Sequence, residues 1–159
     1  MRNFVWVCML GVLLFSCDEK RVYDTYKTLP KHWEKKDKVL FLFENNDTIQ
    51  PYNLFLNLRN TNDYEFSNLF LITTFKSPNN NEVVDTLEYE MAKPTGEWLG
   101  EGYGTKENKL FFKEKYTFKE KGAYTLTVTH AMRKNGNIKG IETLEGVTEI
   151  GFRIEKITD

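Results

Sequence analysis

Cysteine is scarce in this sequence of 159 residues. The two cysteines, Cys8 and Cys17, both lie near the N-terminus. If the chain is cut before Cys17 and this residue is modified, the mature protein holds no free thiol. That excludes a disulfide, a thiolate metal site and a cysteine nucleophile. The mature chain must then be stable through its core alone, which is feasible because a domain of about 140 residues buries roughly two-thirds of its unfolded surface.

Histidine is equally scarce, and an excess of charge of one sign is missing. The two histidines, His32 and His130, lie far apart in the sequence, whereas a zinc site needs three or four ligands. Neither has a nucleophile signature around it, so no Ser-His-Asp arrangement is predicted. We interpret His130 as a core or edge residue. The formal net charge is −1 and no basic stripe is present, so we predict no nucleic-acid partner. Because no convergent set of ligating or catalytic side chains is visible, we also predict no metal, no cofactor and no small-molecule substrate.

Sustained helical periodicity is missing as well, and alternation of period two takes its place. It is clearest over residues 123–133, where threonines and alanines alternate with larger, mostly apolar side chains. The apolar run Val39–Phe43 predicts a strand buried on both faces, whereas the polar segment 31–38 predicts a loop. Roughly eight or nine short strands with turn signals between them predict an all-β fold, an antiparallel β-sandwich. Jelly-roll and immunoglobulin-like strand orders both remain open.

The N-terminal segment has the pattern of an export signal. Arg2 precedes an apolar run from Phe4 to Phe15, which has the usual size of a secretory signal peptide and is shorter than the roughly 20 residues of a membrane-spanning helix. Leu14-Phe15-Ser16-Cys17 resembles a bacterial lipobox, although Phe15 is bulkier than the common pattern. We therefore predict lipidation of Cys17, with palmitate among the acyl groups. Two acyl chains on one N-terminus would anchor the protein stably.

These signals divide the chain into three parts. Residues 1–16 are predicted to be the lipoprotein signal peptide, and residues 17–21 a lipidated, charged and solvated tether. Residues 22–159 are predicted to form a single β-sandwich domain.

A glycine-rich segment, residues 96–104, predicts an extended loop. Its two acidic residues would repel phosphate, so a phosphate-binding loop is disfavoured. Trp98 and Tyr103 are the candidate contacts for a partner protein or a glycan. The alternative is that Trp98 folds back and plugs the end of the sandwich.

Two further surface patterns involve acidic residues. Glu88 and Glu90 share the outward face of one predicted strand, about 7 Å apart, a separation that could suit glycoside hydrolysis. Paired outward glutamates are far more often a solvated face, and we predict no enzyme activity. Thr48 and Thr86 follow aspartates and precede Ile49 and Leu87, which matches an O-glycosylation pattern of exported proteins in one bacterial phylum. Thr48, in a predicted turn, is the better candidate.

Several blocks across the mature chain together resemble the family of gliding motility-associated lipoproteins called GldH. They are Cys17-Asp18 with Val22-Tyr23-Asp24, Asn53-Leu54-Phe55 with Leu58-Arg59-Asn60, Tyr64 with Ser67-Asn68-Leu69-Phe70, Asp85-Thr86-Leu87-Glu88-Tyr89-Glu90-Met91-Ala92, Gly96-Glu97-Trp98-Leu99-Gly100, Glu107-Asn108-Lys109, Ala131-Met132-Arg133 and Gly151-Phe152-Arg153-Ile154-Glu155.

This resemblance implies a non-enzymatic cell-envelope lipoprotein that is required for gliding and is associated with the type IX secretion and motility machinery. The implied location is lipid-anchored at the outer membrane, on its periplasmic side, among other envelope motility and secretion proteins. Of the family's functional positions, only the lipidated cysteine carries over, onto Cys17. A glycan-binding module that uses Trp98 and Tyr103 is the alternative function.

Overall fold

The chain folds back on itself, so that strands from its two halves pair in nested order. The computed structural model describes residues 18–157, and within that range it contains ten strands and no helix. Five antiparallel pairs join the first strand to the last, the second to the ninth, and so on inward. The strands are β1 (Arg21–Thr28), β2 (His32–Glu34), β3 (Val39–Asn45), β4 (Tyr52–Asn60), β5 (Asn68–Lys76), β6 (Glu82–Glu90), β7 (Lys106–Tyr116), β8 (Gly122–His130), β9 (Thr143–Glu145) and β10 (Val147–Lys156).

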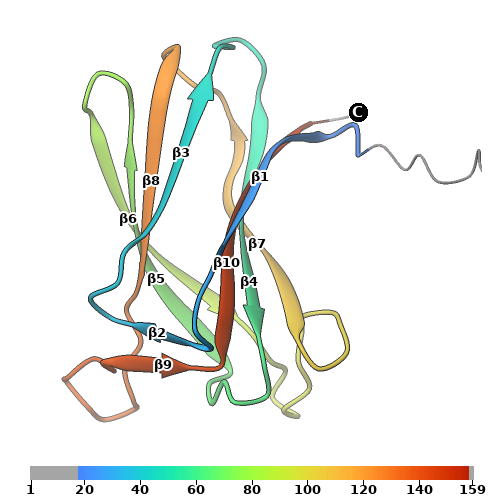
Figure 1. The fold of residues 1–159 in the computed structure, drawn as a ribbon, viewed down its shortest axis with the longest axis vertical. Helices are drawn as coiled ribbons and strands as arrows, with labels where there is room; N and C mark the ends of the chain where they lie inside the picture. The colour runs from blue at the N-terminus through green and yellow to red at the C-terminus, as the bar shows by residue number, and fades with distance from the viewer. Residues whose placement is uncertain (1–17, 158–159) are drawn as a thin grey trace, which may run out of the picture.

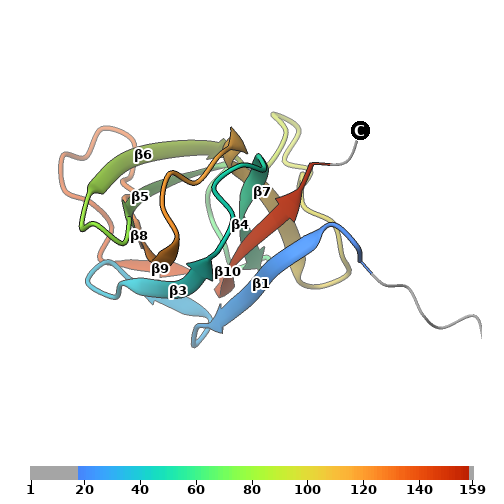
Figure 2. The ribbon, with the colours of Figure 1, turned by 90° about the horizontal axis from the view of Figure 1, so that it is seen from above.

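This long double-stranded ribbon wraps into two facing sheets. One sheet has the order β1-β10-β4-β7, the other has β3-β8-β5-β6, and the short pair β2-β9 forms a third. Figures 1 and 2 show the two layers face to face, with β2 and β9 crossing between them at one end. A ribbon wound in this way is a jelly-roll. The structure therefore confirms the predicted all-β sandwich and selects the jelly-roll order.

The core lies between the two sheets and follows the predicted alternation. Along β8, for example, every second side chain is buried and its neighbours are half-exposed or exposed. The fully buried large side chains come from both sheets, from the short strand β2 and from two connections between strands. They are Trp33, Phe41, Leu54, Leu56, Leu58, Leu69, Leu71, Met91, Phe118, Tyr124, Leu126 and Phe152. Burial of this apolar surface is the main driving force for the fold.

Two sequence predictions about the first half of the chain are wrong. The run Val39–Phe43 is not buried on both faces, because Leu40 and Leu42 are 52% and 64% exposed. As β3, it is the edge strand of an antiparallel sheet whose outer face is open. The segment 31–38 is not only a loop, since it contains β2, which pairs with β9. Trp33 on β2 is completely buried and closes one end of the core.

Both open sides of the sandwich are bridged by tyrosine hydroxyls. Tyr23 on β1 donates to the carbonyl oxygen of Leu42 on β3, at 3.4 Å. On the other side, Tyr89 on β6 donates to the carbonyl oxygen of Phe111 on β7, at 2.7 Å. Unpaired edge carbonyls invite pairing with other chains. These two bonds cover part of each edge and tie the two sheets together.

Candidate functional site

The predicted anchor lies next to the first described residue. Cys17 and the signal peptide 1–16 lie outside the described residues, so their lipidation and cleavage remain predictions. Asp18, the next residue, forms an ion pair with Arg153 of β10. The backbone nitrogen of Lys156 donates to the carbonyl oxygen of Lys20, at 2.8 Å. The segment that was expected to be a solvated tether is thus bound along the end of β10.

Arg153 is the centre of a cluster of charges on the outer face of the β1-β10-β4-β7 sheet. Its guanidinium pairs with Asp24 at 2.8 Å and with Glu155 at 2.5 Å, in addition to Asp18. Lys109 on β7 reaches the same Glu155 oxygen at 2.7 Å. Burial favours the neutral form of Glu155, but the hydrogen bonds from these two cations outweigh it and lower its pKa below the usual range. Arg153 also lowers the pKa of Asp18 through a hydrogen bond.

Arg59 on β4 is the centre of a second cluster on the same face. It contacts Glu107 at 2.9 Å and Glu149 at 2.5 Å, and its guanidinium lies 4.4 Å from the centre of the Tyr26 ring. Tyr26 donates to Glu107 at 2.8 Å and accepts from Asn57 at 2.9 Å. Burial, followed by the bond to Glu107, raises the pKa of Tyr26 to about 12.

Together the two clusters cover the outer face of β4, the face opposite the core. Phe55 is 4% exposed and Asn57 is 2% exposed. The Lys109 ammonium lies 4.1 Å from the centre of the Phe55 ring, and long charged side chains can cover apolar surface in this way. Because each of the carboxylates in these clusters faces a cation, the arrangement suits a stable surface layer better than proton transfer.

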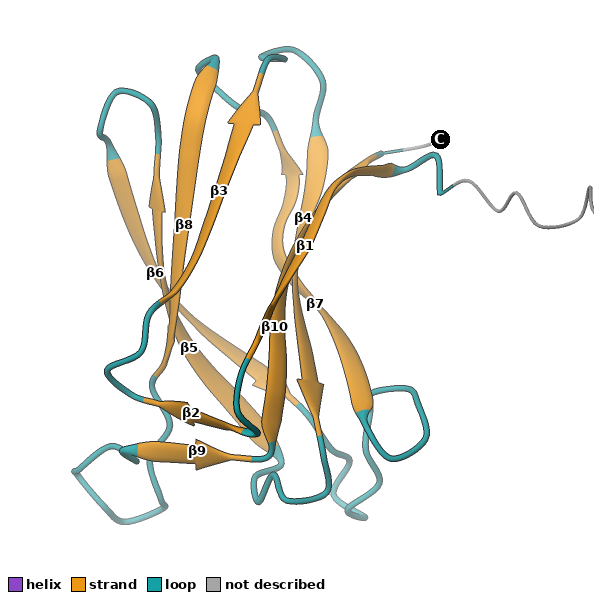
Figure 3. Cartoon of the chain, in the orientation of Figure 1, coloured by secondary structure: helices purple, strands orange, loops and turns teal. Residues whose placement is uncertain are grey.

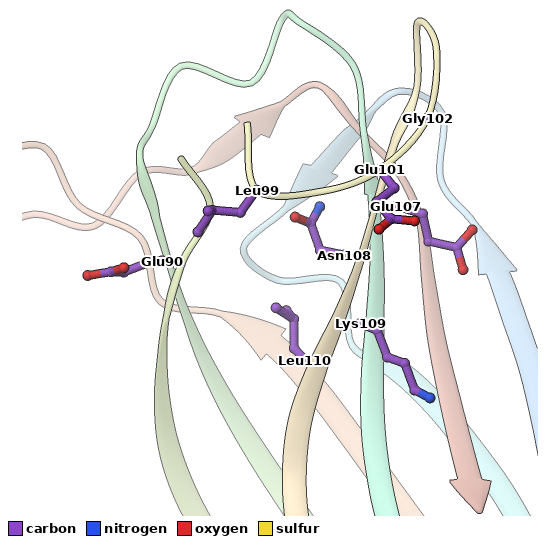
Figure 4. Close-up of a pocket in the computed structure, with 8 residues that line it drawn as sticks. All are labelled: Glu90, Leu99, Glu101, Gly102, Glu107, Asn108, Lys109 and Leu110. Atoms are coloured by element: carbon purple, nitrogen blue, oxygen red, sulfur yellow. The ribbon is translucent and has the colours of Figure 1, made fainter. Parts of the chain in front are cut away.

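An open cleft of about 790 Å³ lies beside the glycine-rich loop, next to the start of β7. Figure 4 shows Asn108 and Leu110 on β7 between Glu90 on one side and Glu101 and Glu107 on the other. The Asn108 amide is buried, and it donates to Asn60 at 2.9 Å and to a backbone carbonyl of β4.

This cleft offers little catalytic chemistry. Gly100 passes so close to Asn108 that a Cβ there would lie 2.6 Å from the amide oxygen, and Glu107 is already bound to Arg59. Over residues 18–157, no group of three or more histidine, cysteine, aspartate or glutamate side chains is arranged to hold a metal ion. In the same range, no helix is long and apolar enough to cross a membrane.

Trp98 and Tyr103 share the loop but differ in exposure. Trp98 is half-buried, donates to the side chain of Asn62 at 3.2 Å, and lies 6.1 Å from the ring of Tyr64. Tyr103 is fully exposed. Trp98 therefore packs on the end of the sandwich, and Tyr103 is the side chain that the loop presents to solvent. A role for either in partner or glycan contact stays a prediction.

The other predicted surface residues are scattered. Thr48 is half-buried in the loop between β3 and β4, and Thr86 is exposed in the middle of β6. Glu88 and Glu90 are exposed on the outer face of β6. His130 is 2% exposed, its ring lies 5.5 Å from that of Trp33, and neither ring nitrogen has a hydrogen-bond partner. Burial lowers its pKa, as suits an uncharged core residue.

Sequence reasoning did not identify Arg59, Arg153 or Tyr26 as organising residues. Arg153 lies between the inward residues Phe152 and Ile154. Two of its three partners, Asp18 and Asp24, lie more than a hundred positions earlier in the sequence. The signal in the sequence is that Arg59 and Arg153 each stand next to apolar residues in segments of alternating character. The sequence contains no information on which strands are neighbours. Both clusters form because β1, β10, β4 and β7 lie side by side in one sheet.

Comparison with known proteins identifies relatives over almost the whole chain. A family model described as GldH lipoprotein matches residues 21–154. The chain is 51% identical to the "Gliding motility lipoprotein GldH homolog" of Christiangramia forsetii, over 96% of this chain and 94% of that protein. It is 45% identical to the "Gliding motility lipoprotein GldH" of Flavobacterium johnsoniae, over 98% of each.

Similarity to solved structures is much weaker. The infectious bursal disease virus VP2 subviral particle matches 87% of this chain and 33% of its own, with 11% identity and a TM-score of 0.42. A similarity at this level carries no argument about function.

Proposed function

Since this chain belongs to the GldH lipoprotein family, we propose that it is a non-enzymatic component of the envelope machinery for gliding motility and type IX secretion. It is a gliding motility lipoprotein, anchored in a membrane of the cell envelope. The observation that carries the proposal is the family match over residues 21–154, together with Cys17 four positions before it. The carboxylates of the outer face are paired with cations of the same chain, which supports a structural role for them over a catalytic one.

The anchor is tested by replacing Cys17. In cells that carry Cys17→Ala, we expect acyl labelling to disappear, the protein to leave the membrane fraction, and colonies to stop spreading. Cys8→Ala is the matched control, because Cys8 lies inside the predicted signal peptide and should leave all three readouts unchanged. Normal acylation and spreading of the Cys17→Ala strain would contradict the proposal.

The partners are proposed to be other envelope motility and secretion proteins. Crosslinking of the tagged native protein in cells, followed by mass spectrometry, should recover such proteins. Recovery of only abundant, unrelated membrane proteins would count against membership of that machinery. A parallel measurement compares the secreted proteins of cells with and without this gene, and unchanged secretion would restrict the role to motility.

The proposed location is the periplasmic leaflet of the outer membrane. Protease added to intact cells should then leave the protein whole, and the same protease should degrade it once the outer membrane is opened. Degradation in intact cells would place the protein on the cell surface.

Two residue-level proposals accompany this function. We propose Thr48 as an O-glycosylation acceptor before Thr86, because Thr48 lies in an irregular loop while Thr86 lies in a strand bonded to β5. Mass spectrometry of the native protein, compared with its Thr48→Ala and Thr86→Ala variants, tests both.

A glycan-binding function is the second candidate, and the full exposure of the Tyr103 ring favours it. Binding on a glycan array that is lost with Tyr103→Ala would support it, whereas no binding to any polysaccharide would remove it. Tyr103→Ala is a cleaner probe than Trp98→Ala, because the indole of Trp98 also packs on Tyr64.

A further inference from the structure

Strand order places both ends of the described chain at one end of the sandwich. The strands of each sheet are antiparallel, so the start of β1, the end of β10 and the connections 46–51, 77–81 and 117–121 all lie at this end. We call it the anchor end. The connections 61–67, 91–105 and 131–142 and the pair β2-β9 lie at the opposite, distal end, as Figures 1 and 3 show.

The chain leaves the predicted acylation site without a free spacer. Asp18 is one peptide bond from Cys17, and its carboxylate is paired with Arg153. Its carbonyl oxygen accepts from the backbone nitrogen of Arg21 at 3.2 Å, and Arg21 is already paired with Glu155 in the sheet. The lipid is therefore attached to a residue whose neighbour is bonded to the body of the protein.

The group that holds Asp18 is itself fixed from three strands. The Arg153 side chain is 16% exposed and bonds to Asp24 on β1 and to Glu155 on β10. Lys109 on β7 completes the group by pairing with Glu155. A rotation of the body about Asp18 would have to break the pair between Asp18 and Arg153, a charge-assisted bond that is stronger than a neutral hydrogen bond. The bonds from Asp24 and Glu155 keep the Arg153 guanidinium in place to make that pair.

We infer that the anchor end lies directly against the phospholipid bilayer that holds the acyl chains, so that the distal end points away from it. This inference rests on the proposed lipidation of Cys17. The ten residues of β10 span about 30 Å at the rise of a strand, so the bilayer and the distal end are separated by about that distance. Among the exposed side chains at the distal end are Tyr103 and Ile138, which places them where a partner away from the membrane can reach them.

The experiment measures how close each end lies to the lipid headgroups. The lipidated chain has no other free thiol, so one introduced cysteine can carry a fluorophore without cross-labelling. Ile49 at the anchor end and Tyr103 and Ile138 at the distal end are 87%, 105% and 98% exposed, so replacing them should not disturb packing. The labelled proteins are placed in phosphatidylcholine vesicles that contain a nitroxide quencher on the headgroup.

We expect the label at Ile49→Cys to be quenched several-fold more than the labels at Tyr103→Cys and Ile138→Cys. Equal quenching at the three positions, or stronger quenching at the distal positions, would overturn the inference. Vesicle flotation is measured on the same samples. Protein that does not float has lost its anchor, and that outcome contradicts the proposed lipidation instead of the orientation.

A spacer variant provides the matched control. An insert of about twelve glycine and serine residues between Cys17 and Asp18 behaves as a flexible coil of about 20 Å. We expect it to float as the parent does, while the quenching at Ile49→Cys falls to the level of the distal positions. Unchanged strong quenching in this variant would show that something other than the short connection orients the body, and would contradict the inference.

Discussion

Replacing Tyr26 with phenylalanine removes one oxygen atom from the centre of the Arg59 cluster. The ring stays, so its packing on Gly151 and under the Arg59 guanidinium is retained. The hydroxyl that donates to Glu107 and accepts from Asn57 is lost. Asn57 is 2% exposed, and the oxygen of its side-chain amide has no hydrogen-bond partner. Without the Tyr26 hydroxyl, the whole side-chain amide of Asn57 would be buried without any hydrogen bond.

A buried polar group left without a partner costs about 1–3 kcal/mol, and we expect Tyr26→Phe to lower the free energy of unfolding by that amount. For a domain of this length, the loss corresponds to about 3–10 °C in Tm. The measurement is urea unfolding of the soluble chain from Asp18 onward, followed by tryptophan fluorescence. Absorbance titration of the tyrosines should also lose the group whose pKa is raised to about 12.

Tyr23→Phe is the matched control for this prediction. Its hydroxyl makes a single exposed bond of 3.4 Å to a backbone carbonyl, so we expect a change within about 0.5 kcal/mol, as for most surface substitutions. If Tyr26→Phe were as stable as Tyr23→Phe, the Arg59 cluster would not contribute to folding as argued, and water would have to reach Asn57.

The remaining predictions concern the core, a turn and an edge strand. His130→Leu removes two unpaired buried nitrogens. Because burial lowers the pKa of His130, the parent protein loses stability as the pH falls below about 6.5. The stability advantage of the variant, measured by urea unfolding, should therefore grow from pH 7 to pH 5.5. Gly146→Ala should cost about 2 kcal/mol or more, since its φ is +81° and a Cβ would lie 2.3 Å from a backbone nitrogen. Gly136→Ala, at φ +76° with open space around it, should lower the free energy of unfolding by about 1 kcal/mol. Equal losses for Gly146→Ala and Gly136→Ala would refute the role of the close backbone contact at Gly146. Leu40→Thr should be neutral within about 0.5 kcal/mol while Phe41→Ala costs about 3–5 kcal/mol; a large loss for Leu40→Thr would mean that the outer face of β3 is covered.

Much of the fold could be predicted from the sequence because burial alternates along several strands, with β3, β5 and β8 as the clearest cases. The inward residues of β8 are the larger side chains that the period of two selects, and β5 alternates in the same way. Alternation predicts burial wrongly where an apolar residue is exposed or an outward residue is covered. Leu40 and Leu42 look like core residues but lie on an open face, whereas Phe55 and Asn57 occupy the outward side of β4 and are covered by charged side chains.

The candidate site was less predictable for a different reason. Its chemistry depends on which strands are neighbours, and alternation contains no information on strand order. Arg153 and Asp24 are 129 positions apart, yet they lie 2.8 Å apart in the sheet. The short strands β2 and β9 could not be predicted for another reason, because three residues are too few for a period to be recognised.

The nested pairing also explains why a single N-terminal lipid can set the direction of the whole domain. In a ribbon folded once at its middle, the first and last strands pair along their full length, so the start of β1 is held by the end of β10. An acyl anchor on Cys17, four residues before that pair begins, would be attached to a central strand of a sheet as well, because β10 also pairs with β4. A longer free segment would leave the lipid equally strong as an anchor and would lose the direction. The connection at Asp18, more than any property of the acyl chains, is therefore the feature that would fix which end of the protein its partners meet.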